Sequence, residues 1–207
     1  ETLGDTLFKE RNIEEIWGKY ETFLKQFNNE SINKLLEEQG QRIITTSMTL
    51  KDKDPFCGIG GIVDYSLELA RAANKLNKAY SFNISNASII KCALLSVVGR
   101  IGTLAVDRLV DKDSDWHKEK LGQYYDWNES CPKYRPQDMT LWYMQHYNIS
   151  LTWEEWSAIK LVSESNTEIT SFYAQDRSNL ALAMQMAHDV VMKIEKDKIL
   201  GLHVTPF

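Results

Sequence analysis

The chain has 207 residues, 43% of them hydrophobic, which is enough to bury a full core and excludes a disordered chain. Its 24 basic and 29 acidic residues give a net charge of −5 without a cluster of Lys and Arg, so nucleic acid is not an expected partner. No stretch approaches the roughly 18 to 20 apolar residues of a membrane span, and no charged region followed by an apolar one opens the chain, so we expect a cytoplasmic protein without membrane association.

The three cysteines give no sign of a redox or zinc site. Cys57, Cys92 and Cys131 are odd in number and include no C-x-x-C pair. A disulfide framework or a thiolate zinc site would need paired cysteines. We therefore interpret them as packing residues of a protein from a reducing compartment.

The N-terminal third of the chain is predicted to be mainly helical. Residues 13–36 carry apolar side chains at spacings of three and four, which predicts one long amphipathic helix or two helices with a break at Asn28 and Asn29. Residues 40–60 contain Gly, Thr, Asp and Pro and are predicted to form a loop. A further helix is predicted over 61–78, because one face of that segment is apolar.

The remaining segments contain local signals for helix starts. Ser85 can cap a helix that runs toward Gly99, and Pro136 is well placed as the first residue of a helix over 136–147. Thr152 and Glu155 fit the capping box of another helix.

Strand patterns are scarce in the rest of the chain. Residues 107–134 combine aspartates with aromatic residues and show no steady period, which predicts a long ordered excursion or a short hairpin. The last helix is predicted over 179–198, with Gly201 at its exit. The predicted fold class is therefore all-α.

The order of these elements, with short sequence matches, resembles the HD-domain phosphohydrolases of the compact variety found in phages and bacteria. Residues 60–68, GGIVDYSLE, stand where that family has GGLLEHSLE. Residues 92–102, CALLSVVGRIG, stand where it has ALLHDIGKIG. The resemblance covers about residues 55–198 and continues through three further segments, at residues 121–128, 151–160 and 187–195.

The resemblance also implies a metal site, because family members hold a divalent cation through two histidines and two aspartates. At the matching positions this chain has Tyr65, Ser96, Val97 and Asp189, so one of the four ligands remains, and Arg100 replaces the family's Lys. A phenol, a hydroxyl and an isopropyl group provide no strong donor set for Mg²⁺, Mn²⁺ or Fe. We therefore predict no metal, no cofactor and no catalytic residue.

The predicted architecture is an HD-domain-like helical bundle, with residues 1–50 as an N-terminal helical extension and residues 51–207 as the HD-like domain. The expected function is that of a pseudoenzyme, not an enzyme. It would act as a structural or protein-interaction module, with a protein partner or in a homo- or hetero-oligomeric assembly. Such a protein could be a phage virion or assembly component, in the virion or the host cytoplasm, or a modulator of a partner enzyme.

The alternative is a residual nucleotide or phosphate sensor, or a metal-independent phosphohydrolase. Gly60 and Gly61 precede a helix whose first amides could hold a phosphate, although glycines that only turn a loop into a helix are commoner. Arg100 and Asp189 would complete such a ligand site, or would pair with each other in a structural role.

The histidines and tryptophans leave further roles open. His117, His146, His188 and His203 share no helix face at metal-binding spacing, which favours surface or hydrogen-bonding roles. Five of the six tryptophans lie between residues 116 and 156. They could anchor an interface, but packing is the commoner role of such residues. The N-terminal amphipathic helix is the other docking candidate, or a cover for the core.

Overall fold

The computed structural model describes residues 10–163 and 175–202. The all-α prediction is confirmed, because the described elements are helices apart from one two-stranded antiparallel sheet. These elements are α1 (Ile13–Lys25), α2 (Glu30–Thr45), α3 (Gly61–Tyr80), α4 (Asn86–Leu95), the 3-10 turn η1 (Val98–Arg100), β1 (Leu109–Asp111), α5 (Asp115–Leu121), β2 (Tyr125–Trp127), α6 (Pro136–His146), α7 (Trp153–Leu161) and α9 (Asn179–Ile199).

The helix starts coincide with the capping signals in the sequence. Asn29 accepts a hydrogen bond from the backbone N–H of Ile32, so the helical region 13–36 is divided at Asn28 and Asn29, one of the two predicted alternatives. Ser85 caps α4 in the same way. Thr152 and Glu155 form both bonds of the capping box at the start of α7.

The loop predicted for residues 40–60 begins later than expected. Helix α2 continues to Thr45, with Gly40 in its interior. A Cβ atom on Gly40 would lie 3.1 Å from the ring of Trp17, so this glycine allows α1 to approach α2 closely. Ile43 and Ile44 are buried beyond it, and their burial outweighs the helix-weakening effect of the glycine.

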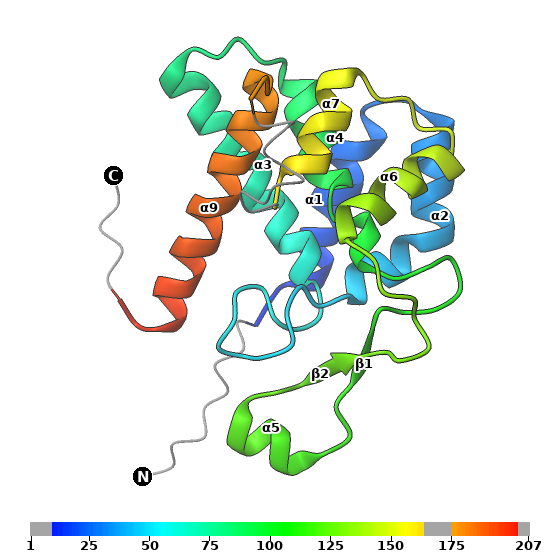
Figure 1. Cartoon of the computed structure of the whole chain (residues 1–207), viewed down its shortest axis with the longest axis vertical. Helices are drawn as coiled ribbons and strands as arrows, with labels where there is room; N and C mark the ends of the chain where they lie inside the picture. Colours follow the sequence, from blue (N-terminus) through cyan, green and yellow to red (C-terminus); the bar gives the residue numbers. More distant parts are fainter. Residues whose placement is uncertain (1–9, 164–174, 203–207) are drawn as a thin grey trace.

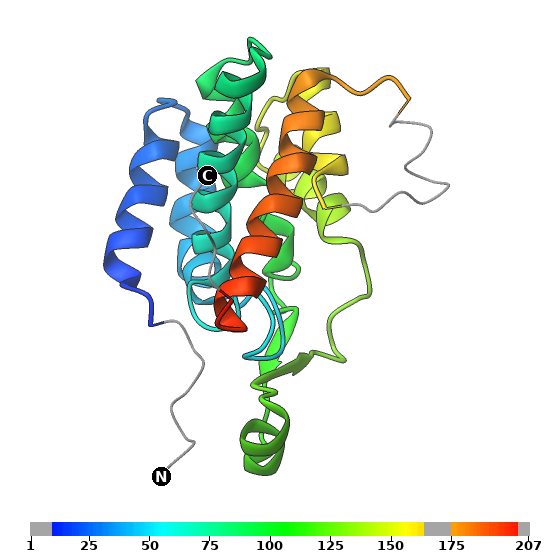
Figure 2. The same ribbon diagram turned by 90° about the vertical axis from the view of Figure 1, so that its left-hand side faces the viewer.

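The long helices lie side by side and form the body of the molecule. Figures 1 and 2 show α1, α2, α3 and α9 extending along the long axis, with α4, α6 and α7 packed among them. The segment from β1 through α5 to β2 projects from one end of this body. The excursion predicted for residues 107–134 is therefore a hairpin with a short helix at its tip. No helix of the described ranges combines the length and the apolar character needed to cross a membrane.

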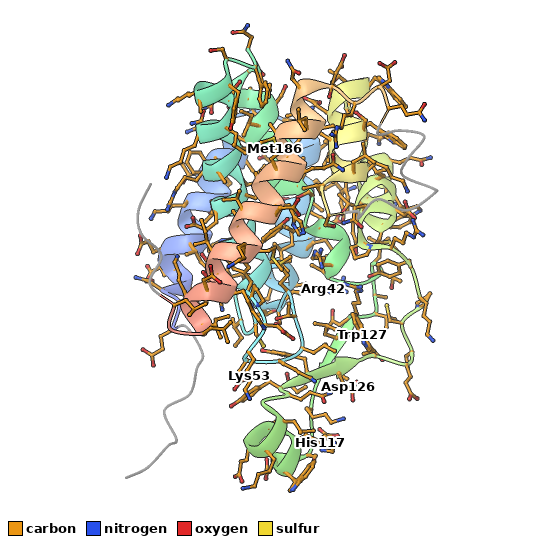
Figure 3. All side chains as sticks on the ribbon, turned by 60° about the vertical axis from the view of Figure 1, so that its left-hand side comes forward. Arg42, Lys53, His117, Asp126, Trp127 and Met186 are labelled. Carbon is orange, nitrogen blue, oxygen red and sulfur yellow. The ribbon has the colours of Figure 1, made fainter. Side chains whose placement is uncertain are left out.

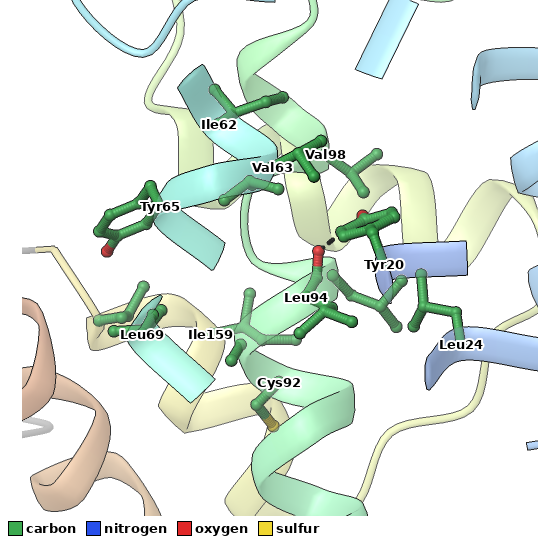
Figure 4. Packing of buried hydrophobic residues seen from close by; sticks show 14 of the residues in the cluster. Tyr20, Leu24, Ile62, Val63, Tyr65, Leu69, Cys92, Leu94, Val98 and Ile159 are labelled. Atoms are coloured by element: carbon green, nitrogen blue, oxygen red, sulfur yellow. Dashed lines mark hydrogen bonds between the residues drawn. The ribbon is translucent and has the colours of Figure 1, made fainter. Parts of the chain in front are cut away.

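One hydrophobic cluster joins the N-terminal helices to the rest of the body. Tyr20 and Leu24 of α1 lie beside Leu94 of α4 and Val63 of α3, as Figure 4 shows. The division of the chain at residue 50 stays a prediction, but the side chains on its two sides share this core. All three cysteines are free and buried, as expected for packing residues.

Candidate functional site

Tyr65, one of the site residues predicted from the sequence, binds a residue of α9. Its ring is 2% exposed, and its hydroxyl lies 2.7 Å from Nδ1 of His188. The two rings meet edge to face with centroids 5.8 Å apart, and Phe56 packs edge-on against the other side of Tyr65. The hydrogen bond therefore joins α3 to α9 at the centre of the predicted site.

The electrostatics of this pair favour the neutral forms of both side chains. Burial raises the pKa of Tyr65 above its ordinary value, although Arg100 opposes the shift. Burial also lowers the pKa of His188, and Arg100 lowers it further while Asp189 raises it. Both side chains are therefore uncharged at neutral pH, and the hydrogen bond joins a phenol to a neutral imidazole.

Ser96 and Val97 follow α4 and direct no donor toward Tyr65 and His188. The Ser96 hydroxyl donates to the carbonyl oxygen of Ala93 over 2.9 Å, within its own helical turn. Val97 is completely buried in the hydrophobic cluster. Both positions therefore serve the packing of the helix end.

Arg100 ends η1, which is fixed against α6. The N–H of Gly99 donates to the Thr140 hydroxyl over 2.9 Å, and a Cβ atom on Gly99 would lie 2.0 Å from the carbonyl oxygen of Pro136. Burial lowers the pKa of the Arg100 guanidinium.

The alternative pairing of Arg100 with Asp189 is not formed in the described part of the chain, where Asp189 is exposed on α9 and no ion pair joins the two residues. The two charges are nevertheless close enough to the same imidazole, that of His188, to act on its pKa in opposite directions.

Gly60 and Gly61, at the start of α3, are packed, and their amides already have partners. The N–H of Gly60 donates to the carbonyl oxygen of Ile44 over 2.8 Å, and that of Gly61 donates to the carbonyl oxygen of Gly58 over 3.0 Å. Side chains of α1 cover Gly60, since an added Cβ would lie 2.8 Å from Ile16. Phosphate binding by Gly60 and Gly61 stays a prediction, and these bonds weigh against it.

The residues at the implied metal position do not fit a divalent cation. Nδ1 of His188 is already bonded to Tyr65, and the Ser96 hydroxyl is bonded within its own helix. A single carboxylate, Asp189, would remain for an ion that prefers about six ligands. Among the described residues, no group of three or more His, Cys, Asp and Glu side chains is placed to hold a metal ion. His203 lies outside the described residues.

Sequence reasoning missed a second polar site near the hairpin. Arg108 and Tyr134 line a groove with a volume of about 780 Å³ beside β2. Neither residue belongs to a motif, and only the fold brings them together across 26 positions. In the sequence, a basic residue precedes a segment rich in aromatic residues. This pattern is too common to indicate a binding site.

No protein-family model, curated protein or solved structure matches the chain.

Proposed function

We propose that the chain is an HD-like pseudoenzyme that acts as a structural or protein-interaction module. The observation that supports this most directly is the hydrogen bond between Tyr65 and His188. This bond takes up the hydroxyl of Tyr65, the residue that stands where the family has its first metal-binding histidine. Val97 adds a hydrocarbon side chain where a metal-dependent phosphohydrolase of this type needs a carboxylate.

Exposed aromatic residues on α6 and α7 support an interaction role. Trp142 is 43% exposed and Trp153 is 65% exposed. Trp142 stacks on His146, and Trp153 stacks on Trp156, so the rings are held in fixed positions. One ring of each stacked pair also lines a hollow of about 440 Å³, whose lining includes Leu141, Trp142, Ile149 and Trp156. Rigid exposed tryptophans beside a hollow are typical anchors of protein interfaces.

Elemental analysis and a hydrolysis assay test the loss of catalysis. We expect less than about 0.1 divalent metal ion per purified chain and no turnover of p-nitrophenyl phosphate in the presence of Mn²⁺. One ion per chain that is lost in Asp189→Ala would contradict the proposal. So would turnover that is lost in Tyr65→Phe.

The interaction role requires a separate measurement. A partner that co-purifies from native cells would be produced alone, and its dissociation constant measured for three forms of the chain. We expect Trp142→Ser to weaken binding about tenfold or more, because a buried anchor contributes at least about 1.4 kcal/mol. Tyr80→Ser is the control, since Tyr80 is 61% exposed but lies at the end of α3. Equal affinities for all three forms would count against this face.

A phosphate- or nucleotide-binding sensor is the second candidate, and Arg100 favours it. Its guanidinium is desolvated, and it has no ion-pair partner and no side-chain hydrogen bond within residues 10–163 and 175–202. A charged group in such surroundings is stabilised by an anion. Thermal shift with a panel of nucleotides tests this, because a ligand at 100 times its dissociation constant stabilises the fold by about 2.7 kcal/mol.

A further inference from the structure

The groove beside β2 contains polar groups that the interaction role does not use. Figure 3 shows Asp126 and Trp127 on the sheet, between the helical body and the short helix that carries His117. The groove has a volume of about 780 Å³, within the range of about 300 to 1,000 Å³ that is typical of sites for small molecules.

Arg108 supplies a fixed positive charge to this groove. Its Cζ atom lies 4.7 Å from the ring centroid of Trp127 and 5.7 Å from that of Tyr134. Its backbone is held by bonds to Ile101 and Asn128. In the described ranges no carboxylate forms an ion pair with its guanidinium, and its N–H groups donate to no protein acceptor. The five planar donors of Arg108 are therefore held next to two aromatic rings, without an acceptor among the described residues.

Tyr134 contributes a second group without a partner. Its hydroxyl oxygen is buried and has no hydrogen bond of ordinary geometry among the described residues, beyond the weak contact with Cys131. The polar group beside it is the thiol of Cys131, a weak hydrogen-bonding group that is directed at the carbonyl oxygen of Val106. A buried hydroxyl without a good partner is destabilising, so a ligand that accepts a hydrogen bond from it would be stabilised here.

The charges around the groove favour an anion. Asp126 is neutralised by Lys112 at 2.6 Å, and Glu129 and Lys133 are both exposed at its edge. These pairs leave the positive charge of Arg100, which lies nearby, without neutralisation. Burial, together with this like charge, lowers the pKa of Arg108 to about 10, so the guanidinium remains protonated at neutral pH.

We propose that the groove is an oxyanion site in which Arg108 binds two oxygens of a phosphate group and the Tyr134 hydroxyl donates to a third. The planar fork of a guanidinium matches the oxygen spacing of a phosphate. The ligand is a free phosphate ion or a phosphate monoester small enough for the groove. This inference develops the sensor candidate and places its ligand at the hairpin, away from Gly60 and Gly61. It does not depend on the interaction role.

Calorimetric titration of the full chain with sodium phosphate, AMP and adenosine tests the site. We expect saturable 1:1 binding of phosphate and AMP and none of adenosine. Arg108→Gln should weaken phosphate binding about tenfold or more, and Tyr134→Phe about threefold, as expected for a charged and a neutral donor. Arg71→Gln is the control, because Arg71 is exposed on α3, and it should bind within about twofold of the original chain. AMP binding tighter than phosphate would identify a monoester, and equal binding the free ion.

Three results would overturn the proposal. These are the lack of saturable phosphate binding, equal affinities of Arg108→Gln and the original chain, and adenosine binding as tight as AMP binding. A melting curve separates ligand binding from packing. We expect Arg108→Gln to melt at or above the original temperature, since it removes an unpaired charge. A lower melting temperature with unchanged phosphate affinity would assign Arg108 to packing alone. If Arg108→Gln does not fold, Tyr134→Phe decides the question.

Discussion

The hydroxyl of Tyr20 on α1 donates a hydrogen bond of 2.8 Å to the carbonyl oxygen of Leu94 near the end of α4, 74 residues away (Figure 4). The last carbonyls of a helix have no partner within it, and this one is completely buried. Tyr20 therefore supplies a hydrogen-bond donor to a carbonyl at a helix end that water cannot reach. The same bond links the N-terminal region to the centre of the fold.

Replacement of Tyr20 by Phe should lower the free energy of unfolding by about 1 to 3 kcal/mol, because the Leu94 carbonyl would be left buried without a donor. Urea denaturation monitored by circular dichroism measures the change. Tyr80→Phe is the matched control, and its exposed hydroxyl should contribute almost nothing. A loss in Tyr20→Phe no larger than that in the control would show that the bond is not needed.

The ion pair between Lys91 and Glu155 should be important for stability, since the two side chains are only 17% and 7% exposed. Glu155→Ala would leave the ammonium of Lys91 buried without its carboxylate, and would also remove the capping-box bond to Thr152. We expect a loss of about 2 kcal/mol or more in urea denaturation. Glu154→Ala, at the exposed neighbouring position, should cost less than about 0.5 kcal/mol.

Two glycine substitutions should have opposite effects. Gly99→Ala would bring a Cβ atom within 2.0 Å of the Pro136 carbonyl oxygen and 2.5 Å of the Thr140 nitrogen, so at least about 3 kcal/mol should be lost. Gly18→Ala lies inside α1 with no other atom within 4 Å of the added methyl group, and should gain about 0.5 to 1 kcal/mol. Thermal melting of both variants would check the prediction, and a stabilised Gly99→Ala would refute the close approach of η1 to α6.

His188 should make the protein less stable in acid. A histidine in an unfolded chain titrates near pH 6.5, and burial holds the folded-state pKa of His188 below that value. Below about pH 6.5 the unfolded state then binds more protons than the folded state. The contribution of His188 to the free energy of unfolding is therefore complete above about pH 6.5, and it is lost as the pH falls toward the folded-state pKa. The charged or titratable groups that act on it are Tyr65 on α3, Arg100 on η1 and Asp189 on α9.

Urea denaturation at pH 7.5 and pH 5.0 measures this dependence. His188→Gln should lose less stability over this interval than the original chain, because Gln does not titrate. His117→Gln, on α5, should behave like the original chain, since α5 has no buried residue. An unchanged pH dependence in His188→Gln would contradict the expected direction.

Local signals in the sequence predict where these helices begin, but they do not predict where every helix ends. Asn29, Ser85, Pro136 and the Thr152 box depend on chemistry within a few residues, so the sequence reveals them. The continuation of α2 past Gly40 depends on the ring of Trp17, which lies on another helix. Glycine composition alone therefore predicted a loop where packing favours a helix.

The positions of the candidate site stay a prediction, and the contacts that they make could not be predicted. The sequence singled out Tyr65, Ser96, Val97, Arg100 and Asp189. The bond between Tyr65 and His188 spans 123 residues and follows from the crossing of α3 and α9, which no spacing rule encodes. Arg108 and Tyr134 went unnoticed for the same reason.

The short helix at the tip of the hairpin has a practical use. Because none of its side chains is buried, a fluorescent dye attached at Glu119, after exchange to cysteine, would leave the core intact. All three native thiols are buried, so such a dye would react selectively at this position. The tip could then report optically on events in the neighbouring groove.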